Sequence, residues 1–130
     1  MSNLKIIQTK FKKPDVTIIN RTSHTVNLYD HITNKLIKSY KKNGIELRFY
    51  QDRRIIGNIN GVSLYSIQNI KLNQKVPVTE NIYHIVSPHI KNAFPWRDDF
   101  IIPIFLKKNK NGLIIGCTAF GGTKQEIIYL

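Results

Sequence analysis

Residues 81–94 read NIYHIVSPHIKNAF and contain the signals that decide the fold. Asn81 to Val86 is an apolar run of strand length that stops at Ser87-Pro88. Ser87 suits the N-cap of a helix, and Pro88 suits its first position, where the missing N–H costs nothing. This stretch therefore predicts a strand followed by one or two helical turns over His89–Phe94.

On either side of this stretch, the chain divides into short apolar or alternating runs separated by polar turns. Two Asn-Gly pairs, Asn43-Gly44 and Asn60-Gly61, each predict a tight turn between strands, because a type I′ turn needs positive φ at both central residues. The expected strands are residues 16–20, 25–29, 35–40, 45–50, 55–59 and 62–67 before the helix, and 100–106, 113–120 and the tail 124–130 after it.

These runs indicate one mainly β domain over residues 1–130, with residues 1–14 as a candidate flexible N-terminal segment. No stretch with helical periodicity exceeds about ten residues, which disfavours a parallel sheet with crossover helices. We expect a mainly antiparallel, partly closed barrel or two packed sheets of six to eight short strands. One short helix follows Pro88.

The chain carries 20 Lys and Arg against 8 Asp and Glu, a formal net charge of +12. Lysine outnumbers arginine by 15 to 5, and the sequence holds 22 Ile and 13 Asn but two Ala, so codon bias explains part of this charge. The remainder favours an anionic ligand over duplex DNA in particular, since phosphate-gripping surfaces often use arginine. One cysteine and no apolar run of about 20 residues predict a soluble cytoplasmic protein without contact to a membrane.

The residues offer little for catalysis. His31-Ile32-Thr33 supplies one His-x-Thr element, but His24, His84 and His89 lack the hydroxyl two positions later that a two-histidine phosphoesterase needs. Cys117 lies in an apolar run, as an inert buried thiol does. We therefore predict no catalytic residue, no metal site and no cofactor, with a phosphodiesterase as the runner-up enzyme.

Binding residues are more informative. The corner Arg21–His24 combines a guanidinium, two hydroxyls and an imidazole, a set that suits a nucleotide or equally a hydrogen-bonded β-corner. Trp96 and Arg97 join an aromatic plane to a cation, although Arg97 has two aspartates beside it with which to pair. Lysines crowd the turn 107–112, and tyrosines recur along the strands at 29, 40, 50, 65 and 83, as they do on single-stranded nucleic-acid platforms and in ordinary sheets.

Five blocks in the same order resemble a family of small phage and prophage proteins. They are Ile19-Asn20-Arg21-Thr22-Ser23-His24-Thr25-Val26, Asn60-Gly61-Val62, Ile82-Tyr83-His84-Ile85-Val86-Ser87, Arg97-Asp98-Asp99-Phe100-Ile101-Ile102-Pro103 and Asn111-Gly112-Leu113-Ile114-Ile115-Gly116-Cys117-Thr118-Ala119-Phe120. Together they span about residues 17 to 120. Ser23 stands where the family pattern has proline. We link this family to the first type of Thoeris anti-defence sponge.

The resemblance implies an oligomeric phage protein that sequesters a cyclic ADP-ribose isomer, and in some members a cyclic oligonucleotide, without cleaving it. It implies action in the cytoplasm of the bacterial host during infection. Phosphates, a base and ribose hydroxyls call for cations, an aromatic plane and amides. The expected ligand-binding residues are Arg21, His24, Tyr83, Asn92, Trp96, Arg97, Lys107 and Lys108. The alternative is a basic phage or mobile-element protein that binds nucleic acid or an acidic host protein.

Overall fold

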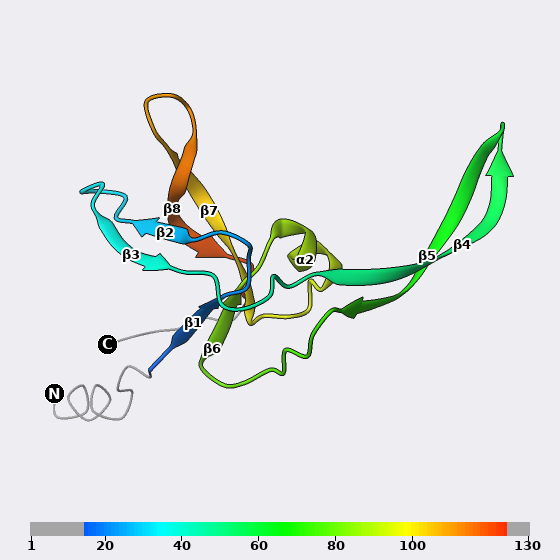
Figure 1. The fold of residues 1–130 in the computed structure, drawn as a ribbon, viewed down its shortest axis with the longest axis horizontal. Helices are drawn as coiled ribbons and strands as arrows, with labels where there is room; N and C mark the ends of the chain where they lie inside the picture. The colour runs from blue at the N-terminus through cyan, green and yellow to red at the C-terminus, as the bar shows by residue number, and fades with distance from the viewer. Residues whose placement is uncertain (1–14, 125–130) are drawn as a thin grey trace, which may run out of the picture.

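A computed structural model of the chain describes residues 15–124, in which β-strands dominate (Figure 1). The elements are β1 (Thr17–Asn20), β2 (Val26–Tyr29), β3 (Leu36–Tyr40), β4 (Phe49–Ile59), β5 (Val62–Leu72), β6 (Ile82–Ile85), the helix α2 (Pro88–Ala93), β7 (Phe100–Lys108) and β8 (Ile114–Gly121). The N-terminal segment 1–14 and nearly all of the expected tail strand lie outside the described residues. Among the described residues, the mainly β fold is confirmed, and so is the one short helix expected after Pro88, which begins at Pro88 itself.

Six strands form one nearly closed sheet in the order β1-β6-β7-β8-β2-β3, and β4 and β5 form a separate two-stranded sheet. Antiparallel pairs β2/β3, β4/β5 and β7/β8 contain most of the paired residues, as expected. The pairs β1/β6, β6/β7 and β2/β8 are parallel, which the sequence analysis did not predict. A parallel neighbour needs a long crossover. Here the six-residue helix α2 and its flanking turns make the crossover from β6 to β7, and such a helix is too short to give a periodic signal in the sequence.

Asn20 closes the barrel at the end of β1. A parallel bridge joins Asn20 to Lys42, just beyond β3, so the two edges of the six-stranded sheet meet. The Asn20 side chain is buried and donates to the carbonyl oxygens of His24 at 2.7 Å and Tyr40 at 2.8 Å. Its Oδ1 accepts from the backbone and hydroxyl of Thr22. The corner Arg21–His24 therefore forms a hydrogen-bonded β-corner, which is one of the two interpretations that its sequence allows.

Strand β6 and the first two residues of β7, Phe100 and Ile101, are buried on both faces. Alternation along β6 sends Tyr83 and Ile85 into the barrel, where Ile101 joins them, and sends His84 and Val86 to the outer side. There Val86 and Phe100 pack with residues of α2 and of the base of the β4–β5 hairpin. Burial on both faces is typical of parallel strands and explains the continuous apolar run of residues 82–86.

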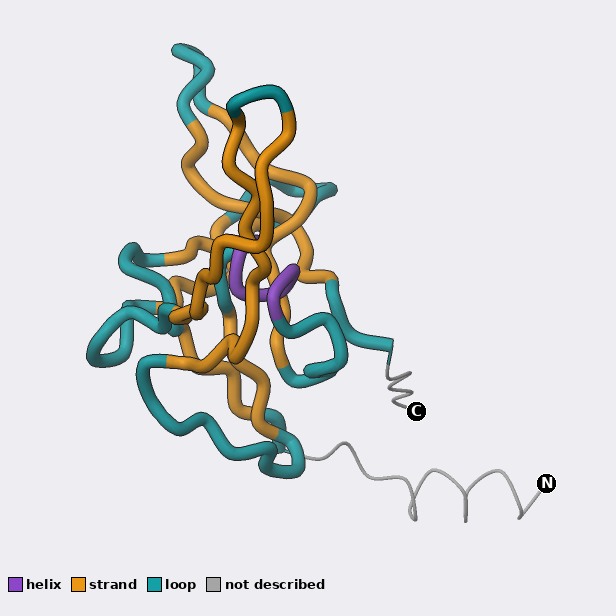
Figure 2. Tube along the Cα trace, turned by 90° about the vertical axis from the view of Figure 1, so that its right-hand side faces the viewer, coloured by secondary structure: helices purple, strands orange, loops and turns teal. Residues whose placement is uncertain are grey.

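The helix α2 lies between the barrel and the β4–β5 hairpin, at the centre of the molecule when the hairpin points at the viewer (Figures 1 and 2). The Ser87 hydroxyl accepts from the Ile90 N–H at 3.3 Å, and Pro88 stands at the first position, as the sequence predicts. Ile90 and Phe94 anchor it in the outer cluster. Within residues 15–124, no helix has the length and hydropathy that crossing a bilayer requires.

The β4–β5 hairpin projects away from the rest of the molecule (Figure 1). Its turn has positive φ at both Asn60, 48°, and Gly61, 83°, as the sequence predicts. The other Asn-Gly pair does not make a hairpin, because β3 pairs with β2 and the next strand starts later than expected, at Phe49. Leu47 instead leaves the strand pattern and is buried in the outer cluster at the base of the hairpin.

Candidate functional site

A cavity of about 520 Å³ lies beside the start of β7. Its walls are the loop before β6 and the turn that leads from α2 into β7, and its lining comprises residues 78–83 and 96–99. Three of the sequence-predicted residues, Tyr83, Trp96 and Arg97, line it. Trp96 is 68% exposed, with its ring held edge-on to Phe94 at 5.5 Å, so a planar face is available at the mouth.

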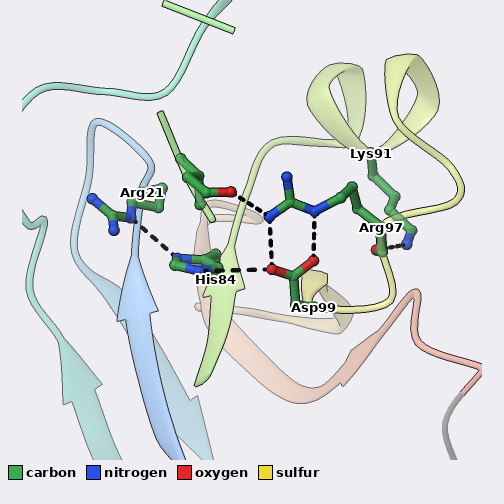
Figure 3. A network of polar contacts seen from close by, with 6 residues as sticks. Arg21, His84, Lys91, Arg97 and Asp99 are labelled. Atoms are coloured by element: carbon green, nitrogen blue, oxygen red, sulfur yellow. Dashed lines mark hydrogen bonds and ion pairs between the residues drawn. The ribbon is translucent and has the colours of Figure 1, made fainter. Parts of the chain in front are cut away.

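Arg97 is held by four contacts. Its Nε and Nη2 each donate at 2.8 Å to the two carboxylate oxygens of Asp99, a bidentate pair. Nη2 also donates to the Val76 carbonyl oxygen at 2.7 Å, and the guanidinium lies 4.2 Å from the centre of the Phe100 ring. Nη1 takes no part in these hydrogen bonds and points away from Asp99 (Figure 3). Arg97 thus pairs with a neighbouring aspartate, which is one of the two interpretations of the sequence.

His84 extends this network on its far side (Figure 3). Its Nδ1 accepts from Arg21 Nε at 3.2 Å, and its Nε2 lies 3.8 Å from Asp99 Oδ2, beyond hydrogen-bond range. Burial, reinforced by the positive charge of Arg21, lowers the pKa of His84 to about 4. The ring is therefore neutral near pH 7 and, since Nδ1 is an acceptor, carries its proton on Nε2.

Acidic groups dominate the charge of the cavity. Glu80, Asp98 and Asp99 line it together with Arg97. Lys91 lies behind the turn rather than in the cavity, and its ammonium donates to the Arg97 carbonyl oxygen at 2.7 Å. Burial lowers the pKa of Lys91. Carboxylates suit the hydroxyls of a ribose and the amine of a base, so the cavity matches the sugar and base of a nucleotide better than several phosphates.

The lysines of the predicted site lie elsewhere. Lys107 and Lys108 end β7, whereas the cavity lies before its first residue, so roughly 25 Å of strand separates them. Lys107 donates to Asn34 Oδ1 at 2.9 Å and lies 5.3 Å from the centre of the Tyr29 ring. The strand predicted over residues 100–106 already separates Arg97 from Lys107 and Lys108, and grouping them in one site overlooked the length of that strand.

The remaining predicted residues also fall outside the cavity. Asn92 is exposed on α2. Arg21 contacts His84 from β1's end, on the other side of the Arg97–Asp99 pair. His24 lines a smaller cavity of about 320 Å³ between β2, β7 and β8, with mostly apolar neighbours. The structure therefore gathers Tyr83, Trp96 and Arg97, with Arg21 joined to them through His84.

Glu80 and Asp98 are lining residues that the sequence analysis did not single out for binding. Glu80 lies in the loop before β6, and a single carboxylate in a polar loop carries no signal of its own. A larger and more open cavity of about 670 Å³ lies on the other side of Arg97, lined by residues 70–77 and Phe94. Arg97 thus separates the two cavities.

The cysteine and the histidines considered for catalysis lie in different surroundings. Cys117 is buried, and burial raises the pKa of its thiol, which agrees with an inert cysteine. His31 is exposed in the turn between β2 and β3, while His84 is buried. In the described part of the chain, no three His, Cys, Asp or Glu side chains gather as a metal site would require.

Comparisons with known proteins assign no family. No protein-family model and no solved structure matches the chain. An 89-residue stretch, 68% of the chain, is 29% identical to the DNA-directed RNA polymerase subunit beta' of Helicosporidium sp. subsp. Simulium jonesii. The chain spans about a tenth of that subunit, since the match covers 10% of its length.

Replacing Arg97 with alanine should destabilise the protein strongly. Arg97→Ala leaves Asp99 buried and without its partner, which costs about 3–5 kcal/mol of unfolding free energy. Arg48→Ala is the matched control, because the Arg48–Glu46 pair is exposed and should cost under about 1 kcal/mol. Urea unfolding followed by circular dichroism measures both. Equal losses in the two variants would contradict a structural role for the Arg97–Asp99 pair.

The neutrality of His84 predicts a pH dependence of stability. The unfolded chain protonates this histidine below about pH 6.5 and the folded protein only near pH 4, so unfolding free energy falls as the pH drops between these values, by roughly 3 kcal/mol in all. Urea unfolding at a series of pH values should show that His84→Gln loses this part of the slope. His31→Gln, at an exposed histidine, should keep it; a His84→Gln slope equal to that of the parent would refute the assignment.

Proposed function

We propose that this protein binds and sequesters a nucleotide-type ligand, a cyclic ADP-ribose isomer by the resemblance to the Thoeris anti-defence sponges, and does not cleave it. The observation that carries the proposal is that Tyr83 lines the same cavity as the adjacent residues Trp96 and Arg97, which come from a later part of the sequence. A volume of about 520 Å³ lies within the range of small-molecule sites.

The cavity offers a group for each part of such a ligand. Trp96 provides a planar face on which a base stacks. The carboxylates of Glu80 and Asp98 accept from ribose hydroxyls or a base amine. Arg97 Nη1, turned away from Asp99, is the cation available to a phosphate (Figure 3). These groups bind and orient, and the proposal assigns none of them a catalytic step.

The proposed place of action follows from the same resemblance. A sponge lowers a signal made by a bacterial immune enzyme, so it acts in the cytoplasm of the infected host. We also propose a homo-oligomer. A cyclic oligonucleotide remains an alternative ligand of the same chemical class, since it too presents bases, riboses and phosphates.

Ligand depletion followed by recovery tests this function. The protein is incubated with a cyclic ADP-ribose isomer, the free ligand is measured, and the protein is then denatured by heat. We expect depletion of the free ligand and its recovery intact. A cleaved product would indicate a phosphodiesterase instead, and no depletion of either a cyclic ADP-ribose isomer or a cyclic oligonucleotide would refute the proposal.

Trp96→Ala should weaken this binding by about tenfold or more, the loss expected for one stacked base. Because Trp96 is 68% exposed, the variant should fold, which makes it a cleaner probe than Arg97→Ala. Phe105→Ala is the control, since Phe105 is an aromatic residue 73% exposed outside the cavity lining. Isothermal titration compares the variants, and equal affinities would place the ligand elsewhere.

A second function is supported by the surface at the far end of β7. Lys107 lies over the Tyr29 ring, and Lys38 Nζ lies 5.2 Å from the centre of the Tyr40 ring on the adjacent strand β3. Lysines beside aromatic rings favour contact with a single-stranded nucleic acid. The polymerase subunit that the chain resembles over 89 residues is named as DNA-directed. An acidic host protein would use the same lysines.

Salt dependence tests this second function. Oligonucleotide affinity should fall steeply as salt rises, and removing Lys107 and Lys108 together should reduce the log–log slope by about two. Lys75→Ala with Lys124→Ala is the matched control, because these lysines are exposed outside this surface. An affinity that does not vary with salt, or no binding, would exclude phosphate-dominated recognition.

A further inference from the structure

The arm, defined as β4, β5 and their turn, exposes large apolar side chains along its whole length. Each strand has 11 residues, so the arm extends about 36 Å. Nine large apolar residues on it are between 37% and 66% exposed: Tyr50, Ile55, Ile56, Ile59, Val62, Leu64, Tyr65, Ile67 and Ile70. A two-stranded hairpin with so much exposed apolar surface is marginally stable by itself in water.

The apolar side chains lie on both faces of the arm. The register pairs Ile59 with Val62, and alternation along β5 puts Leu64 on the same face. Ile55 pairs with Tyr65 on the opposite face, where alternation also puts Ile67. Contact with the chain's own barrel could cover one face at most. Figure 1 shows the arm extending away from the barrel, with its two outer strand edges unpaired in the described structure.

The distal part of the arm is also uncharged. Residues 55–70 contain no Asp, Glu, Lys or Arg, in a chain whose formal net charge is +12. Two copies of so basic a chain repel each other over most of their surfaces. They can approach most closely where the charge is absent, and that is the apolar part of the arm.

We propose that the arm packs against the arm of a second copy of this chain in a twofold dimer. The nine apolar residues expose on the order of 1,000 Å² over the two faces of the arm, of the same order as the roughly 800 Å² per partner of a stable interface. A twofold axis lets each arm cover one face of the other with the same residues. A nucleic acid binds mainly through its phosphates and so does not favour an uncharged surface. This dimer gives an interface to the homo-oligomer proposed above and does not rest on the nucleotide ligand.

Sedimentation velocity of the full chain over a wide range of concentration tests the dimer. The parent should be dimeric, and Leu64→Lys with Tyr65→Lys, which puts a charge on each face, should raise the dissociation constant by about tenfold or more. Ile32→Lys with Phe105→Lys adds the same charge at residues 77% and 73% exposed on the barrel, and should leave the dimer intact. Circular dichroism checks that each variant is folded.

Amide hydrogen exchange of the parent gives a test without mutations. Protection of residues 55–67 should rise with protein concentration. A parent that stays monomeric, or an arm variant that dimerises as well as the parent, would overturn the proposal. Protection of the arm that requires an added oligonucleotide or other protein would assign it to that partner and overturn the proposal as well. None of these measurements uses the nucleotide ligand. A negative result would therefore refute the dimer and leave the proposed ligand binding to be tested by the depletion experiment.

Discussion

The ion pair between Arg97 and Asp99 is the interaction on which the cavity and its surroundings depend. Both side chains are largely buried, so each would carry a large desolvation cost alone. The bidentate geometry lowers that cost, and Nη2 also donates a hydrogen bond to the Val76 carbonyl oxygen. One guanidinium thereby fixes the turn after α2, the first residue before β7 and the loop that precedes β6. The cavity has a defined wall because these segments share one cation.

The same network requires His84 to be uncharged. Its ring lies near the Phe100 ring and the Arg97–Asp99 pair. A positive charge on this ring would be repelled by the positive charges of Arg21 and Arg97. The favourable contact with Asp99 does not outweigh burial and these two cations. A neutral ring therefore fits better than an imidazolium, and the network depends on the histidine being a weak base. This explains how a histidine can occupy a buried strand.

The sequence predicts the features that depend on neighbouring residues, and it does not predict which distant segments pair with each other. Ser87-Pro88 specifies the start of α2 because cap and proline effects act within one turn, and Asn60-Gly61 specifies a hairpin because positive φ is a property of the pair. Asn43-Gly44 has the same local chemistry, yet its flanking strands pair with other partners. Parallel pairing of β6 with β7 depends on topology, which no local pattern specifies. Among the predicted binding residues, Tyr83, Trp96 and Arg97 line one cavity. Lys107, Lys108 and His24, which were grouped with them only because their blocks follow in the same order, lie elsewhere.

The base of the arm packs against the residues that support the cavity wall. Phe49 and Leu72, at the base of the arm, pack against the outer cluster that contains Val76 and Phe94. Asn73 ties the same base together through bonds to the backbone of Glu46 and Arg48. Val76 in turn accepts from Arg97. Residues 70–77 therefore join the base of the arm to the carbonyl that orients the guanidinium, so the arm, the outer cluster and the Arg97–Asp99 pair form one packed unit.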